Sequence, residues 1–90
     1  MINGFGDATE IEQIRIDLAD ASGAAALHDG ADLSKPDEIE AMVARCTAEI
    51  GAPDLLVNNA GIQFVSPVAD FPPAKWDAIV AINLTAVFHT

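Results

Sequence analysis

The chain has 90 residues, enough for one small domain or for part of a larger one. Fourteen acidic residues against four basic ones give a formal net charge of −10, so the chain repels nucleic-acid phosphates and anionic membrane surfaces, and neither is an expected partner. The single cysteine, Cys46, excludes an intrachain disulfide, and without any signal-peptide or membrane-spanning pattern a soluble, cytoplasmic protein is expected.

The first part of the chain predicts a strand end, a loop and a helix. Met1–Ile2 has the pattern of a short strand, and Asn3-Gly-Phe-Gly6 has the pattern of a loop. Asp7 matches an N-cap, with Glu10 three residues later as the second half of a capping box. Ser22-Gly23 is expected to end the helix. One apolar stripe at helical spacing supports this helix, formed by Ile11, Ile14, Leu18 and Ala21.

A second strand and helix follow. Ala24–His28 is a short extended candidate, and Gly30–Leu33 is a loop. Ser34 is expected to cap the next helix, with Pro36 in its first turn and Asp37 completing the capping box. The apolar stripe of this helix, which would bury Cys46 as a small hydrophobe, consists of Ile39, Met42, Val43, Cys46 and Ile50.

The last part predicts a buried strand and a long helix. Asp54–Asn58 is a continuous apolar run around Leu55-Leu56-Val57, typical of a parallel strand covered on both faces. A third helix is expected from about Ala74 to the last residue. The order β-α-β-α-β-α is that of an α/β protein with a doubly wound parallel sheet, a partial Rossmann-type fold. Residues 1–90 are therefore interpreted as the central part of such a domain, truncated at both ends.

Ligands of such sheets bind beyond the carboxyl ends of the strands, where three loops of this chain should meet. The glycines of the first loop would allow positive φ and close approach to a ligand, although a simple turn explains them equally well. Asp32 could accept a hydrogen bond from an adenine amino group or bond within its own loop. Asn58 and Asn59 could tie neighbouring strands together, and Ala60 and Gly61 would let a flat ligand lie against the backbone.

Two further features bear on chemistry. Asn83 lies within the apolar stretch VAINLTAVF of the last helix, where a buried amide needs partners, and it is either a functional group or a satisfied core amide. His28 and His89 have no carboxylate or cysteine at metal-ligand spacing, so no metal site is expected. The chain has no Gly-x-Gly-x-x-Gly phosphate loop.

Read together, three motifs resemble the short-chain dehydrogenase/reductase family: NNAG at 58–61, Asp32-Leu33 after the second strand, and the helix around Asn83. The resemblance covers essentially the whole chain. Finer features, such as NGFGD at 3–7, DGADLS at 29–34 and NNAGIQ at 58–63, are similar to the bacterial D-3-hydroxybutyrate dehydrogenases of this family.

The resemblance implies a role for each matching position. Gly4 and Phe5 would flank the adenosine ribose of NAD, and Asp32 and Leu33 would flank the adenine. Asn58, Ala60 and Gly61 would line the ribose and the path of the cofactor. Gln63 would hold the substrate carboxylate. Asn83 would be the catalytic asparagine, which holds a water of a proton relay through an irregularity of its helix.

The resemblance also implies what the parent protein does. It would interconvert D-3-hydroxybutyrate and acetoacetate with NAD, as a homotetramer in which the Asn83 helix packs against its copy. The family's Gly-rich turn would precede Met1, and its catalytic serine and Tyr-x-x-x-Lys pair would follow Thr90, so the 90 residues alone are expected to be inactive. The alternatives are a non-catalytic α/β folding or interaction module and, less in keeping with NNAG, another nucleotide-binding α/β protein such as a methyltransferase.

Overall fold

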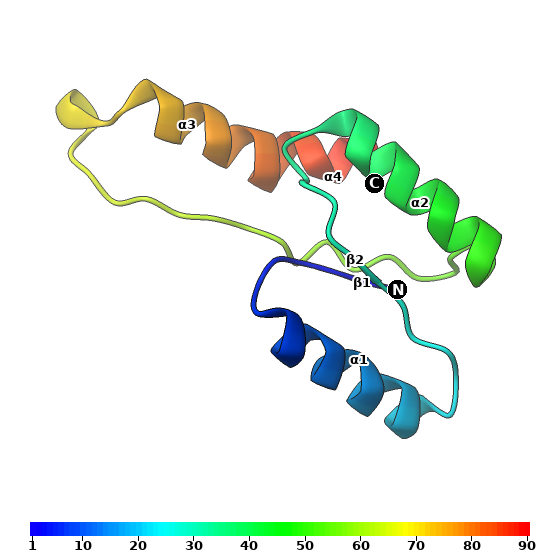
Figure 1. Cartoon of the computed structure of the whole chain (residues 1–90). Helices are drawn as coiled ribbons and strands as arrows, with labels where there is room; N and C mark the ends of the chain where they lie inside the picture. Colours follow the sequence, from blue (N-terminus) through cyan, green and yellow to red (C-terminus); the bar gives the residue numbers. More distant parts are fainter.

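A computed structural model describes all 90 residues, and it arranges helices on both sides of a short parallel sheet (Figure 1). Strands β1 (Ile2–Asn3) and β2 (His28–Asp29) pair in parallel, with Ile2 opposite His28 and Asn3 opposite Asp29. Helix α1 (Ala8–Ser22) lies on one side of this pair, and α2 (Pro36–Glu49) and α4 (Ala86–His89) lie on the other. This arrangement confirms a partial α/β fold with parallel strands.

Helix α1 begins and ends where the sequence predicts. The Asp7 carboxylate accepts hydrogen bonds from the backbone N–H groups of Thr9 and Glu10, at 2.9 and 3.1 Å. These bonds satisfy two of the donors that a helix leaves free at its N-terminus. At the other end, Gly23 has φ = 66° and its N–H donates to the Ala19 carbonyl. A residue with a side chain would be strained in this left-handed conformation.

The predicted cap of α2 is wrong, although the position of the helix is right. Its N-cap is Lys35, and no side chain caps the helix. The Ser34 hydroxyl donates instead to Oδ1 of Asp32, at 2.7 Å, and is therefore not available to α2. Pro36 occupies the first turn as predicted, and Ile39 of the apolar stripe is completely buried.

Residues 54–58 do not form the predicted strand. Leu55, Leu56 and Val57 are 82, 54 and 73% exposed, and the only strands that pair are β1 and β2. An apolar run becomes a strand only when a neighbouring strand supplies its hydrogen bonds, and no segment of this chain does so. The second strand is also shorter than the predicted Ala24–His28, because only its last residue pairs, together with Asp29.

The C-terminal helix is interrupted at Asn83. Helix α3 (Pro73–Val80) continues through a π-helical turn, η2 (Ala81–Thr85), into α4. A π turn accommodates an extra residue within a helix and often occurs at functional sites. One helix from about residue 74 is thus confirmed, with an irregularity at Asn83. A short 3-10 turn, η1 (Val68–Asp70), was not predicted.

The 90 residues form an open arrangement with little core. Only Ala31, Ile39 and Ala86 are buried. The accessible surface is 6501 Å², against about 5,000 Å² for a compact protein of this mass. The radius of gyration is 15.3 Å, where a compact 90-residue domain would have about 12 Å. None of the helices has the length and apolar character needed to cross a membrane.

Candidate cofactor-binding edge

One groove of about 790 Å³ collects the three loops expected at the ligand edge. All seven positions that the sequence links to a cofactor line this groove: Gly4, Phe5, Asp32, Leu33, Asn58, Ala60 and Gly61. They come from segments up to 57 positions apart in the sequence, from Gly4 to Gly61. The parallel βαβ arrangement brings them together, because it places the ends of successive strands at the same edge of the layer.

Hydrogen bonds hold the first loop against the second. The Asn3 side-chain amide donates to the carbonyls of Asp29 and Ala31, both at 3.0 Å. Nε2 of His28 lies 2.9 Å from the Gly4 carbonyl, which makes the ring nitrogen the donor. The loops after β1 and β2 therefore form one connected edge.

Gly4 offers open space but not an unusual backbone. Its φ is not positive, and neither is that of Gly6, so the loop does not use the left-handed conformation that its glycines would allow. A Cβ added at Gly4 would meet no atom within 4 Å. The neighbouring Phe5 side chain is 74% exposed. The surface of this loop is thus accessible to a ligand in the groove.

Asp32 has one engaged and one available carboxylate oxygen. Its Oδ1 accepts from the backbone N–H of Ser34 at 2.9 Å and from the Ser34 hydroxyl at 2.7 Å. Its Oδ2 has only Lys35 Nζ nearby, at 3.6 Å. The Ser34 hydroxyl and then the Ser34 N–H hold the pKa of Asp32 below its usual range, and the Lys35 charge acts in the same direction. Asp32 is therefore an ionised acceptor, which both bonds within its loop and leaves an oxygen for a ligand.

Glu38 positions the backbone of the same loop. Its Oε2 accepts from the Asp32 N–H at 2.7 Å, and its Oε1 accepts from Lys35 Nζ at 2.7 Å. These two bonds, the one from Lys35 foremost, lower the pKa of Glu38. The first turn of α2 thus holds the turn that carries Asp32 and Leu33.

Asn83 bonds directly to the third loop. Its Oδ1 accepts from the Ile62 N–H at 2.9 Å, and its Nδ2 donates to the Ile62 carbonyl at 2.8 Å. The residue is exposed, so the expectation of a buried asparagine is wrong, although the side-chain amide is fully paired. Asn83 itself does not line the groove. It fixes the backbone of Ile62, and both Ile62 and its neighbour Gly61 line the groove.

The remaining predicted residues are placed differently. Oδ1 of Asn58 accepts from the Thr90 hydroxyl at 2.9 Å, so this amide joins the NNAG loop to the end of α4 and not to a neighbouring strand. Gln63 lies beyond Ile62 and does not line the groove. The sequence interpretation missed that Met42, Val43 and Cys46 line the groove, because their helical spacing indicated only a core stripe.

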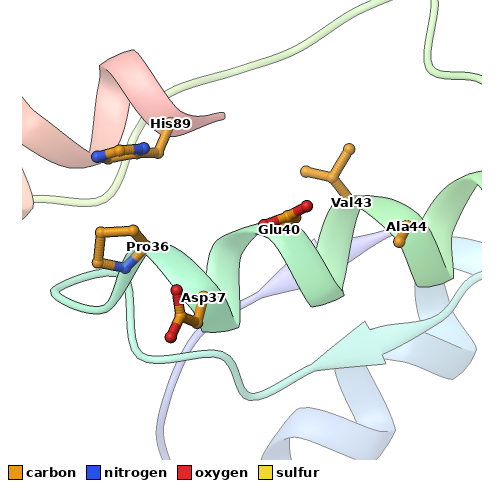
Figure 2. A pocket seen from close by; sticks show the side chains of 6 residues that line it. All are labelled: Pro36, Asp37, Glu40, Val43, Ala44 and His89. Carbon is orange, nitrogen blue, oxygen red and sulfur yellow. The ribbon is translucent and has the colours of Figure 1, made fainter.

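A second, more open hollow of about 520 Å³ lies between α2 and α4 (Figure 2). His89 faces the first turns of α2, where Asp37 and Glu40 carry carboxylates. Nowhere does the structure gather three or more histidine, cysteine or acidic side chains that could hold a metal ion.

Comparison with known proteins identifies the family to which the chain belongs. The family model described as short chain dehydrogenase matches residues 6–90. The chain therefore belongs to the short-chain dehydrogenase/reductase family.

Two bacterial relatives extend this result to the whole chain. The chain is 46% identical over 90 residues to the D-beta-hydroxybutyrate dehydrogenase of Rhizobium meliloti (strain 1021). It is 50% identical over 91 aligned positions to the enzyme of the same name from Cupriavidus necator. In both cases all of this chain is covered, but it spans only 35 and 34% of the length of these relatives.

Solved structures agree with the family and the fold. A gluconate 5-dehydrogenase from Burkholderia cenocepacia, in complex with NADP and tartrate, matches 98% of this chain with a TM-score of 0.81 and 34% identity. A metagenomic short-chain oxidoreductase in complex with NADP matches 97% of it with a TM-score of 0.82. The chain spans 34 and 39% of these two proteins. The extended, unpaired segment 54–58 thus occurs in a chain whose overall path is that of a Rossmann-type protein.

Proposed function

We propose that these residues supply the cofactor edge of a cytoplasmic oxidoreductase that interconverts D-3-hydroxybutyrate and acetoacetate with NAD. The observation that carries this proposal is the convergence of seven positions from three loops on one groove. The high identity to two D-beta-hydroxybutyrate dehydrogenases over the whole chain supports the choice of substrate.

The residues of the groove suit an adenine nucleotide. Asp32 keeps one ionised oxygen free to accept from an exocyclic amino group, and Leu33 supplies an apolar neighbour for the ring. Gly4 and Phe5 would flank the adenosine ribose, where no side chain blocks approach to Gly4. Asn58, Ala60 and Gly61 would line the ribose and the path toward the reacting end. When bound, the nicotinamide cofactor would accept or donate the hydride.

Charge favours NAD over NADP. None of the chain's four basic residues, Arg15, Lys35, Arg45 and Lys75, lines the groove. Three of them are paired with carboxylates. A 2′-phosphate carries a negative charge that needs a cationic partner, and here it would meet a chain with a net charge of −10. Two solved relatives hold NADP, so this preference is a property proposed for this chain and not for its family.

Two residues would serve the reacting end. We place Gln63 at the substrate carboxylate, since its amide can donate to a carboxylate oxygen. Asn83 would act through the π turn of its helix, where the backbone departs from the regular hydrogen-bond pattern. Its side chain is fully engaged by Ile62, so a water of the proton relay would be held by the backbone near Asn83.

The intact enzyme is proposed to be a homotetramer. Trp76 and Phe88 on the C-terminal helix are 62 and 85% exposed, and Ile79 is half-buried. Such apolar area on one helix is suited to packing against a second copy.

The test is turnover by the gene product that carries these residues. It should reduce NAD with D-3-hydroxybutyrate, and kcat/KM should be at least about 10-fold higher than with NADP, a difference of about 1.4 kcal/mol. The isolated 90 residues contain no tyrosine and should show no turnover above background. Equal use of both cofactors would refute the charge argument, and inactivity with D-3-hydroxybutyrate would refute the proposed substrate.

A further inference from the structure

Lys35 lies between two carboxylates where the second loop meets α2. It is three residues from Asp32 on one side and three residues from Glu38 on the other. Its Nζ is 2.7 Å from Oε1 of Glu38 but 3.6 Å from Oδ2 of Asp32. The first distance is that of a charge-assisted hydrogen bond, and the second is too long for one. Lys35 is therefore bonded to Glu38 and not to Asp32.

The backbone holds both carboxylates within reach of this lysine. The Lys35 N–H donates to the Asp32 carbonyl at 2.9 Å, and the Glu38 N–H donates to the Lys35 carbonyl at 3.1 Å. The lysine side chain is 60% exposed and has a flexible four-carbon stem. A rotation of this side chain alone would therefore carry the ammonium group from Glu38 to Asp32.

Glu38 uses its two oxygens for different partners. Its Oε1 holds the Lys35 ammonium group, and its Oε2 accepts from the Asp32 N–H at 2.7 Å. The pKa of Lys35 is raised, first by the hydrogen bond to Glu38, then by the Glu38 charge, and only after these by the charge of Asp32. Glu38 is thus the main partner of the lysine and also a support for the Asp32 turn.

Lys35 and an adenine amino group would compete for the same oxygen. Oδ1 of Asp32 is occupied by Ser34, so Oδ2 is the oxygen left for a ligand. An ammonium group and an amino group are both donors, and an ammonium bonded to Oδ2 would take the place of the amino hydrogen. The site would then lose the acceptor that distinguishes adenine from a base without an amino group.

We propose that Glu38 is a positioning residue that sets the preference of this site for adenine, by holding Lys35 away from Oδ2 of Asp32. The inference rests on the proposed cofactor site and names a determinant of its base specificity. Glu38 does not line the groove, so it acts through Lys35 and Asp32 and not by contact with the cofactor. When Glu38 loses its charge, Lys35 turns to Asp32 and competes with the amino group.

The test is base selectivity in the gene product that carries these residues. The two probes are NAD and its analogue with hypoxanthine, which carries a carbonyl oxygen where adenine carries the amino group. The ratio of their dissociation constants reports recognition of the amino group, because effects of overall charge or stability act on both probes alike. E38Q retains an oxygen that can accept from the Asp32 N–H but loses the charge that holds Lys35. In E38Q the preference for NAD should fall by about three- to fivefold, within the range known for exposed ion pairs.

Two further variants separate this mechanism from a structural effect. E38Q/K35M lacks the competing ammonium group and should return to within about twofold of the wild-type ratio. E40Q removes the same charge from an exposed residue of α2 that faces the second hollow and not the groove, and it should also stay within about twofold. A crystal structure of cofactor-free E38Q should show Lys35 Nζ about 2.8 Å from Oδ2 of Asp32, where it is now 3.6 Å away.

The proposal is overturned if E38Q has the wild-type ratio, if E38Q/K35M stays as low as E38Q, or if E40Q lowers the ratio equally. It is also overturned if Lys35 does not approach Asp32 in the cofactor-free E38Q crystal. None of these measurements uses D-3-hydroxybutyrate, so they do not depend on the proposed substrate. A wild-type gene product that binds neither probe would overturn the cofactor site and this inference together, whereas a ratio that does not respond to Glu38 would overturn this inference alone.

Discussion

Asn83 holds the backbone of Ile62 at both of its hydrogen-bonding groups, accepting from the N–H at 2.9 Å and donating to the carbonyl at 2.8 Å. The two residues are 21 positions apart, and this pair links the π turn of the C-terminal helix to the loop that contains Gly61. A Cβ at Gly61 would lie 3.6 Å from Asn83 Oδ1, so the loop approaches the amide closely. The position of the NNAG loop therefore depends on the helix that follows it.

Replacing Asn83 with aspartate should release this loop. The carboxylate cannot donate to the Ile62 carbonyl and would repel it, which removes one bond worth about 1 kcal/mol and weakens the contact further. Amide exchange at Ile62 should accelerate by roughly 5- to 30-fold, corresponding to about 1 to 2 kcal/mol. N59D is the control, because Asn59 lies in the same loop and makes no side-chain hydrogen bond in the structure. Equal acceleration in both variants would mean that charge alone, and not the Asn83–Ile62 pair, controls the loop.

Removing the Ser34 hydroxyl should change the titration of Asp32. The pKa of Asp32 lies below its usual range chiefly because Ser34 donates to the ionised carboxylate. The Ser34–Asp32 bond therefore stabilises the folded chain at pH values above the pKa that Asp32 has in the unfolded chain. This stabilisation is lost as the pH falls through the lower pKa that Asp32 has in the folded chain. In S34A, a carbon-13 NMR titration should show the Asp32 pKa moving up toward its ordinary value. S22A removes a hydroxyl that bonds to the Leu18 carbonyl on α1, and it should leave the Asp32 titration unchanged.

Gly23 should tolerate a side chain poorly. At φ = 66°, alanine would be strained by about 1 kcal/mol, and the last turn of α1 should fray. Hydrogen exchange in that turn should accelerate by roughly 5-fold in G23A. G6A provides the matched control, because Gly6 does not have a positive φ and its added Cβ would come no closer than 3.8 Å to Ile11. A similar response in both variants would contradict the assignment of Gly23 as the helix-ending residue.

A cation placed in the first loop should shift cofactor preference. Phe5 lines the groove beside Gly4, where the chain has no basic side chain. In the gene product, F5R should raise kcat/KM with NADP relative to NAD by about 10- to 100-fold, the range expected for a charge-assisted hydrogen bond. F64R adds the same charge outside the groove and should leave the ratio within about twofold. An unchanged ratio in F5R would place the cofactor's 2′ position elsewhere.

Local rules account for the elements that the sequence predicted well. Asp7 and Gly23 bound α1 because a helix end needs only nearby groups to satisfy it, an acceptor at one end and a left-handed residue at the other. Ser34 was predicted wrongly by the same rule. The Ser34 hydroxyl could bond either to the N-terminus of α2 or to Asp32. In the structure it donates to Asp32, and α2 has no side-chain cap.

The convergence of the three loops at one edge was predictable, but the contacts between them were not. The order of strands and helices was enough to place Gly4, Asp32 and Gly61 at one edge, because parallel crossovers have a fixed hand. The pairing of Asn83 with Ile62 could not be predicted, since nothing in the spacing of 21 residues specifies which loop the helix meets.

By itself, the sequence determined the helices, the three loops that meet at one edge, and the acidic net charge of the chain. Only the tertiary structure decided that Asn83 is exposed and paired, and that residues 54–58 remain outside any sheet. The physical reason is that helix ends satisfy their hydrogen bonds within a few residues, whereas a strand exists only if another segment lies beside it.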